Sequence, residues 1–284
     1  MQIGEYKLYS IQTGLFRLDG GAMFGVVPKP LWSRTNPADE QNRIDMCMRS
    51  LLLVSDKKKI IVDNGVGYKM SKKLNEIYGV DHSKFTLEGE LGKIGYKTDD
   101  ITDVIITHLH FDHAGGSTKR DENGNLQLMF PNATYHVQKR HWEWAVNPSD
   151  RDKASFMPEN FMLIQEKKQL NFFNGDSKFD DLINLHVVNG HTYAMQLVTV
   201  KDDKTTLLFT ADLFPTTSHL PFAYIMGYDL FPLTTLDEKK KFLPKIADEN
   251  WLLFFEHDAF TETAKVQKNE KGFMLFDKME LKNR

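Results

Sequence analysis

The chain has 284 residues, and its 36 Lys and Arg against 39 Asp and Glu give a formal net charge of −3. This near-neutral balance gives no electrostatic reason to expect nucleic acid or an anionic membrane as a partner. The one cysteine, Cys47, excludes an internal disulfide framework and a cysteine-based zinc site. No apolar run approaches the ~18 residues of a membrane span, and the first residues lack a charged and then apolar leader. We therefore expect a folded cytoplasmic protein without nucleic acid or membrane partners.

Strands are predicted repeatedly in the first part of the chain. Residues 6–18 alternate between apolar and polar side chains as paired strands do, and residues 47–65 are typical of a hairpin that closes on Gly65. Helical spacing follows over residues 68–80 and stops at a glycine. Residues 103–110 are mostly β-branched and apolar, which indicates a buried strand.

The alternation of strands and helices continues to the end of the chain. Strands are predicted over residues 133–138, 183–190, 195–212 (as a hairpin) and 250–258, and helices over residues 139–147, 156–167 and 236–250. Pro244 lies inside the last helix and predicts a kink or an early break. Paired strands with helices between them indicate an α/β (α+β) sandwich of two packed sheets with helices outside, in a single domain over residues 1–284.

The densest group of metal-binding side chains lies in the segment THLHFDHAGG, residues 107–116. His108 and His110 are two residues apart, so at an extended strand end their imidazoles point to the same side. Asp112 and His113 follow as the chain turns away and add a carboxylate and a third imidazole. Neutral imidazole nitrogens with a carboxylate oxygen suit Zn²⁺ or a similar divalent ion. The segment therefore predicts a metal site.

Three distant residues stand at the ends of predicted strands: His191, Asp212 and His257. With the first cluster they bring the candidate ligands to five histidines and two aspartates, enough for two metal ions with open positions. We expect one ion on His108, His110 and His191, the other on Asp112, His113 and His257, and Asp212 as the bridge between them.

Over the span Val54 to His257 the chain resembles the metallo-β-lactamase superfamily. The motifs that carry the resemblance follow one another as they do in that superfamily: HLHFDH at 108–113, GH at 190–191, AD at 211–212 and EHD at 256–258. The resemblance implies a four-layer αββα sandwich with a dinuclear site along one edge. It also implies that Asp63, in the turn IVDNG, supports a metal-binding histidine. The implied cofactors are two divalent ions, Zn²⁺ first, with Mn²⁺, Co²⁺ or Fe²⁺ as alternatives.

The segment DGGAMFGVVPKPLW, residues 19–32, together with THLHFDHAGG and ADLFPT, is similar to the quorum-quenching lactonase branch of that superfamily. The resemblance implies a hydrolase that opens N-acyl-homoserine lactones or related lactones and esters with a hydroxide that bridges the ions. Asp112 and Asp212 are the implied catalytic residues. A loop over residues 19–37 is expected to cover the site and to offer Met23 and Phe24 to an acyl chain.

Two departures from the family pattern affect the expected substrate contacts. Ala194 and Met195 stand where many members carry a second Gly-His pair, and Pro215 stands where homoserine lactonases carry a tyrosine that holds the substrate carbonyl. The candidates to replace that tyrosine are His219, Tyr224 and Tyr228.

Two other functions remain open from the residues. A phosphodiesterase or phosphotriesterase of the same fold would require cationic groups in the pocket, whereas the aromatic and aliphatic residues around the motifs favour a neutral ester. The other alternative is a metal-binding or redox protein that does not catalyse hydrolysis. A homodimer is expected from the frequency of symmetric enzyme pairs. Trp142 and Trp144 receive no functional interpretation.

Overall fold

The computed structural model describes residues 1–270 and 272–281. Over these residues the strands form two seven-stranded sheets and a two-stranded ribbon. The first sheet contains, in spatial order, β1 (Gln2–Ile3), β2 (Tyr6–Asp19), β3 (Arg43–Val54), β4 (Lys59–Val62), β5 (Asp103–Ile105), β8 (Thr134–Gln138) and β9 (Leu170–Phe173). The second contains β10 (Ser177–Lys178), β11 (Ile183–Val188), β12 (Met195–Lys201), β13 (Thr206–Phe209), β14 (Leu252–Phe254), β15 (Thr263–Asn269) and β16 (Gly272–Met279). The ribbon pairs β6 (Thr118–Arg120) with β7 (Leu126–Leu128).

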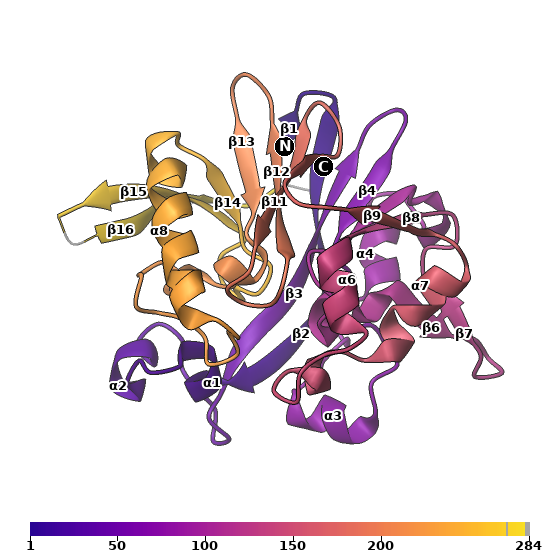
Figure 1. Cartoon of the computed structure of the whole chain (residues 1–284), viewed down its shortest axis with the longest axis horizontal. Helices are drawn as coiled ribbons and strands as arrows, with labels where there is room; N and C mark the ends of the chain where they lie inside the picture. Colours follow the sequence, from indigo (N-terminus) through magenta and orange to yellow (C-terminus); the bar gives the residue numbers. More distant parts are fainter. Residues whose placement is uncertain (271, 282–284) are drawn as a thin grey trace.

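Helices cover the outer faces of the two sheets (Figure 1). On the second sheet, α8 (Pro232–Asp248) packs Phe242, Leu243 and Ile246 into the core. On the first sheet, the cover consists of α4 (Leu87–Lys93), α6 (Lys139–Ala145) and α7 (Met162–Glu166). The αββα sandwich predicted from the sequence is therefore confirmed.

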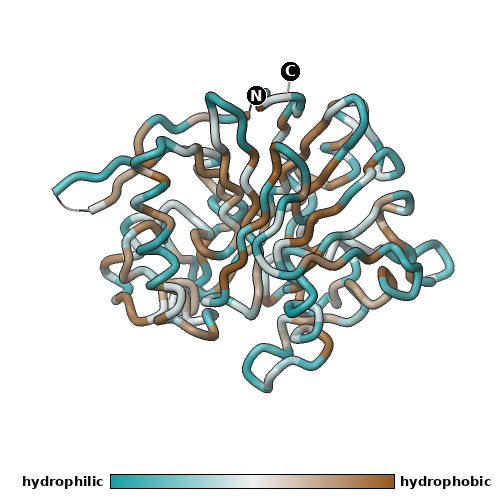
Figure 2. Tube along the Cα trace, turned by 45° about the horizontal axis from the view of Figure 1, so that its top comes forward, coloured by the Kyte–Doolittle hydropathy of each residue, from teal (hydrophilic) through white to brown (hydrophobic). Residues whose placement is uncertain are grey.

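The largest core cluster lies between the sheets and under α8. It joins first-sheet residues such as Leu51 and Val62 to second-sheet residues such as Leu197 and Leu253, all of them fully buried. Brown, apolar segments accordingly follow the central strands in Figure 2, while the outer loops are teal. Burial of this apolar surface is the dominant favourable contribution to folding, and it fixes the two sheets relative to each other.

Several predicted elements differ from the structure in the first half of the chain. The expected paired strands over residues 6–18 are one long strand, β2, which pairs with β3 along its length and shifts register between Gln12 and Gly14. The helix expected over residues 68–80 is shorter, because α3 (Lys72–Ile77) begins after its Ser71 cap. The hairpin over residues 47–65 is confirmed by the antiparallel pairing of β3 and β4.

In the second half, two predicted helices need correction. The helix over residues 156–167 is divided at Phe161 into a 3-10 turn, Pro158–Asn160, and α7. The early break at Pro244 does not occur, since α8 continues to Asp248. The packing of the α8 apolar face on the sheet outweighs the local cost of a proline without an N–H. The hairpin of β15 and β16 has no counterpart among the predicted elements.

The segment expected as a loop over residues 19–37 contains two short helices, α1 (Gly20–Phe24) and α2 (Lys29–Trp32). The Asp19 side chain caps α1 by accepting a hydrogen bond from the N–H of Ala22. Among the described residues, none of the helices is long and apolar enough to cross a bilayer.

Candidate metal centre

The candidate site lies at one edge of the sandwich, where strands of both sheets end. In the first sheet the parallel strands β4 and β5 lead to Asp63 and to the segment of His108. In the second sheet the parallel strands β13 and β14 lead to Asp212 and His257, and His191 follows β11. The polar loops at these strand ends meet at a single edge, which is a common place for binding sites in α/β folds.

The histidine-rich segment is shaped by its contacts past the end of β5. The strand predicted over residues 103–110 stops at Ile105, and the Thr107 N–H donates to Asp63 Oδ1 at 2.7 Å. His108 and His110 therefore lie in a turn beyond the strand, and α5 (Phe111–Ala114) follows as a single helical turn.

Gly115 and Gly116 allow this turn to pack closely on the segment after β4. A Cβ atom on Gly115 would lie 2.1 Å from the Val66 carbonyl oxygen, and one on Gly116 would lie 2.2 Å from that of Asn64. Any side chain at these positions would push the two backbones apart.

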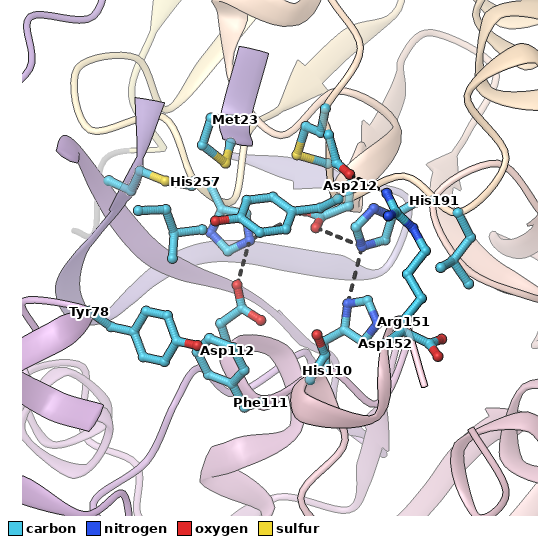
Figure 3. A pocket seen from close by; sticks show the side chains of 17 residues that line it. Met23, Tyr78, His110, Phe111, Asp112, Arg151, Asp152, His191, Asp212 and His257 are labelled. Atoms are coloured by element: carbon cyan, nitrogen blue, oxygen red, sulfur yellow. Dashed lines mark hydrogen bonds and ion pairs between the residues drawn. The ribbon is translucent and has the colours of Figure 1, made fainter. Parts of the chain in front are cut away.

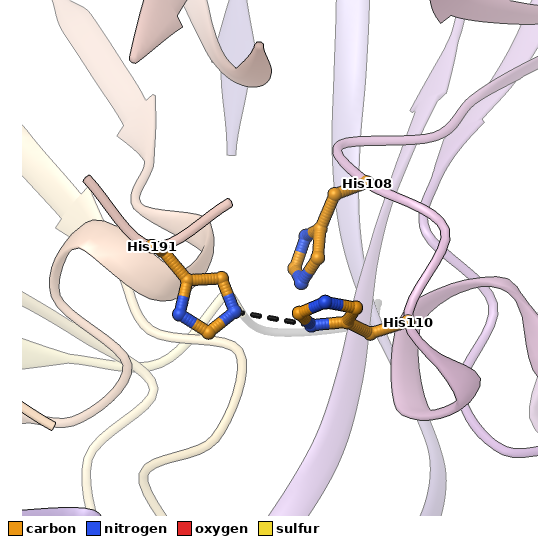
Figure 4. Close-up of side chains that lie close together, drawn as sticks. All are labelled: His108, His110 and His191. Atoms are coloured by element: carbon orange, nitrogen blue, oxygen red, sulfur yellow. Dashed lines mark hydrogen bonds between the residues drawn. The ribbon is translucent and has the colours of Figure 1, made fainter. Parts of the chain in front are cut away.

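The first cluster consists of His108, His110 and His191 (Figure 4). His191 Nε2 lies 3.1 Å from His110 Nδ1, and the three rings approach one another from two segments about eighty residues apart in the chain. Figure 4 shows the imidazoles turned toward a common centre. This arrangement places three nitrogen donors within reach of one cation.

The second cluster consists of Asp112, His113 and His257. His257 Nε2 lies 3.1 Å from His113 Nε2 and 3.8 Å from Asp112 Oδ2. Asp212 lies between the clusters: its Oδ2 is 3.1 Å from His191 Nε2, and its Oδ1 is 3.3 Å from His257 Nε2. The seven side chains proposed from the sequence thus converge at one place.

Burial governs the protonation of the first cluster. It holds the pKa values of His108 and His110 well below the usual range, and neighbouring imidazoles act in the same direction. Both rings are neutral at pH 7, and the Nε2 atom of His108 is buried without a hydrogen-bond partner in the described part of the chain. His110 faces His191 through its Nδ1 atom. A neutral imidazole with an unused lone pair is the form that binds a cation.

Carboxylates dominate the second cluster. Burial lowers the pKa of His257, but the neighbouring Asp212 and Glu256 together outweigh this effect and raise that pKa to about 9. Burial also lowers the pKa of His113, but Glu256 and Asp212 outweigh burial and raise this pKa well above the usual range. The site therefore attracts positive charge. Its imidazole and carboxylate donors fit a pair of divalent cations.

Carboxylates also contact the outer nitrogens of two histidines. Asp63, a candidate from the sequence, lies with Oδ2 3.1 Å from His113 Nδ1, and Asp229 Oδ1 lies 2.8 Å from His191 Nδ1. Glu256 Oε2 is 3.0 Å from the same His113 nitrogen. The sequence motifs do not predict a supporting role for Asp229 or Glu256. Glu256 stands in the EHD motif and could have been found there, but Asp229 has no local signal.

An open pocket leads to the two clusters (Figure 3). Its walls are largely apolar and include Leu18, Met23, Met46, Phe111, Met226 and Leu230. His110, Asp112, His191, Asp212 and His257 face its inner end. Tyr78 and Arg151, on opposite sides of the view, are lining residues that the sequence did not indicate.

Comparison with known families adds an independent observation. The family model described as "Metallo-beta-lactamase superfamily" matches residues 49–257. The chain belongs to the metallo-beta-lactamase superfamily.

Similar members of the superfamily include named lactonases. N-acyl homoserine lactonase AiiA of Bacillus thuringiensis subsp. kurstaki is 29% identical over 174 residues, which are 59% of this chain and only 60% of that protein. An N-acyl homoserine lactonase of Bacillus cereus is 26% identical over 285 aligned residues, 95% of this chain and 97% of the relative.

Solved structures of the superfamily superpose over nearly the whole chain. A probable metal-dependent hydrolase from Staphylococcus aureus, 29% identical, has a TM-score of 0.88 and covers 98% of this chain and 100% of its own. The lactonase AidC, described as a dizinc quorum-quenching lactonase, has a TM-score of 0.80 at 21% identity. The superposition covers 98% of this chain and 96% of AidC. Because AidC is only 21% identical, its similarity supports the fold and not the activity.

Ala194 and Met195 follow the third histidine motif in place of the second Gly-His pair expected from the resemblance, and the imidazole of His141 supports this segment. Ala194 has a left-handed φ of 51°. His141 of α6 donates from Nδ1 to the Tyr193 carbonyl oxygen at 2.6 Å and accepts the Leu109 N–H at Nε2, 2.8 Å away. His141 thus ties the His191 loop to the His108–His110 turn.

The candidate substrate contacts divide into two groups. Met23 and Tyr228 line the pocket. Phe24 and His219 are buried behind it, with their rings stacked 4.7 Å apart, and His219 Nε2 donates to the Met23 carbonyl oxygen at 2.8 Å. Tyr224 faces a separate groove beside α2. The geometry therefore favours Tyr228 among the three replacements considered for the tyrosine absent at Pro215.

Proposed function

We propose that this protein is a dinuclear metal-dependent lactonase that opens N-acyl-homoserine lactones or closely related lactones. The observation that carries the proposal is the position of Asp212 between two histidine clusters at the inner end of a mostly apolar pocket. The lactonase names of the Bacillus relatives support the same substrate class.

In this proposal His108, His110 and His191 would hold one ion, and Asp112, His113 and His257 would hold the other. Asp212 lies between the two sets and would serve both. Two bound divalent ions, Zn²⁺ in our proposal, supply a water of lowered pKa and polarise an ester carbonyl. Asp63 and Asp229 accept from the outer N–H groups of His113 and His191, which fixes the ring orientations.

The remaining chemistry belongs to the chain's own groups. Water adds to the lactone carbonyl carbon, the ring C–O bond breaks, and Asp212 carries a proton to the leaving alkoxide oxygen. Burial raises the pKa of Tyr228, so its hydroxyl stays protonated at neutral pH and can donate to the carbonyl oxygen as negative charge develops there. The product is a hydroxy acid, which releases one proton at neutral pH.

The pocket walls favour a neutral substrate over a phosphoester. The aliphatic and methionine side chains of the wall match an acyl chain. Asp152 adds a carboxylate to the lining, which repels a phosphate group. Arg151 is the specific observation in favour of the phosphoesterase alternative, since it places one positive charge in the pocket.

The test is ring opening of homoserine lactones with short and long acyl chains, followed by proton release, with protein shown to hold two metal ions. Turnover that disappears in Asp212→Ala and persists in Asp203→Ala would support the proposal, because Asp203 is an exposed carboxylate in the β12–β13 turn. Absence of lactone turnover together with phosphoester hydrolysis by the same sample would replace it with the phosphoesterase alternative.

A further inference from the structure

Arg151 is the one arginine or lysine among the pocket-lining side chains of the described residues. It lies in the turn between α6 and the 3-10 turn Lys153–Ser155, on the same side of the pocket as His191 and Asp152 (Figure 3). The proposed lactone chemistry leaves this guanidinium without a role.

The turn that carries Arg151 is held in place by its neighbour Asp152. The buried Asp152 carboxylate accepts from Trp144 Nε1 at 2.7 Å and from Ser149 Oγ at 2.6 Å. The Trp144 indole in turn stacks on Tyr193, with ring centroids 5.1 Å apart, two residues after His191. Trp144, unexplained from the sequence, thus connects the Arg151 turn to the His191 loop.

The Arg151 side chain reaches across the pocket to the other half of the molecule. Its Nη2 donates to the Gly227 carbonyl oxygen at 2.7 Å, in the loop that also carries Tyr228. A guanidinium has five N–H donors in a rigid fork. Within residues 1–270 and 272–281, Arg151 forms no ion pair with a carboxylate, and one hydrogen bond leaves further donors for a ligand.

We propose that Arg151 determines substrate specificity by donating a hydrogen bond to the amide carbonyl oxygen of an N-acylamino lactone. The inference rests on the proposed lactonase function and names the group that the pocket recognises besides the ester. A neutral carbonyl is favoured over an anion because the Asp152 carboxylate lines the same wall and because one donor of the fork is held by Gly227. The acyl chain beyond the amide then lies along Met23, Met226 and Leu230.

The test compares two lactones with wild-type protein, Arg151→Met and the control Lys153→Met, all holding two metal ions. N-hexanoyl homoserine lactone carries the amide, whereas a γ-lactone with a plain alkyl chain lacks it. Lys153→Met serves as the control because it also removes one positive charge from this segment. Lys153 pairs with Asp150 and does not line the pocket. For the amide-bearing lactone we expect Arg151→Met to lower kcat/KM about tenfold or more, as for a lost hydrogen bond to a charged group. For the plain lactone the change should stay within about twofold, and Lys153→Met should leave both substrates unaffected.

A binding measurement separates failure of this inference from failure of the lactonase proposal. Calorimetry with N-hexanoyl cyclopentylamine, which keeps the amide but cannot be hydrolysed, should show a Kd about tenfold higher for Arg151→Met than for wild type. With 2-hexylcyclopentanone, which has no amide, the two Kd values should agree. If wild type opens neither lactone but the amide-dependent difference in Kd appears, the lactonase function fails and Arg151 keeps its role. Equal losses on both substrates and both probes, or no loss on either, would overturn the role of Arg151.

Discussion

Asp212 and His191 lie 3.1 Å apart, from Oδ2 to Nε2, while the other Asp212 oxygen faces His257 of the second cluster. A carboxylate in this position neutralises charge on both sides of the site. Burial raises the pKa of Asp212, but His113 and His191 outweigh this effect and hold it well below the usual range, so the group is ionised at neutral pH.

Replacement of this carboxylate by an amide of the same size tests its proposed bridging role. Asp212→Asn should lower kcat by at least about 100-fold, the loss typical of removing one preorganised electrostatic group. Elemental analysis after dialysis should show fewer than two ions per chain, whereas Asp203→Asn should retain both. Full activity with two ions in Asp212→Asn would contradict the bridging role.

Asp229 is expected to control metal affinity without touching the ion. Its Oδ1 contacts His191 Nδ1 at 2.8 Å, and its Oδ2 accepts from Thr235 Oγ1 at 2.9 Å. Asp229→Asn should weaken the affinity for one ion about 10- to 100-fold, as outer partners of metal-binding histidines do. Competition with a chelator measures this affinity. An unchanged metal affinity in folded Asp229→Asn protein would contradict this role of Asp229.

Two glycines offer opposite effects on stability. Gly116→Ala places a Cβ 2.2 Å from the Asn64 carbonyl oxygen and should cost about 3 kcal/mol of unfolding free energy or more. Gly92 lies inside α4 with nothing near its added Cβ, so Gly92→Ala should stabilise the protein by about 0.5–1 kcal/mol. Urea unfolding of both variants checks the pair, and equal destabilisation would refute the close approach at Gly116.

Many of the strands and helices between residues 6 and 258 and the seven candidate ligands could be predicted from the sequence because strand patterns and His-Asp spacing are local. The supporting groups could not, since Asp229, His141 and Arg151 reach the site through contacts between distant segments. The inward position of Phe24 follows from stacking on His219, which no local pattern reveals. The shorter strand before His108 follows from the Asp63 side chain, which takes the Thr107 N–H.

His141 predicts a loss of stability in acid. Burial lowers its pKa to about 4, and its Nε2 must stay unprotonated to accept the Leu109 N–H. Because the unfolded chain binds this proton near pH 6.5 and the folded chain only near 4, the free energy of unfolding falls as the pH drops through that window, by about 3 kcal/mol for this group. Urea unfolding of metal-free protein at several pH values should show a smaller fall for His141→Gln. Identical pH slopes for variant and wild type would contradict this assignment.

The central claim is that one hydrolytic site works with two metal ions. We would measure lactone opening by metal-free protein as Zn²⁺ is added in known equivalents, with bound metal determined on the same samples. The account predicts that the rate rises with added Zn²⁺ and levels off at two ions per chain. A rate that levels off at one ion, or no lactone opening by protein that holds two, would contradict it.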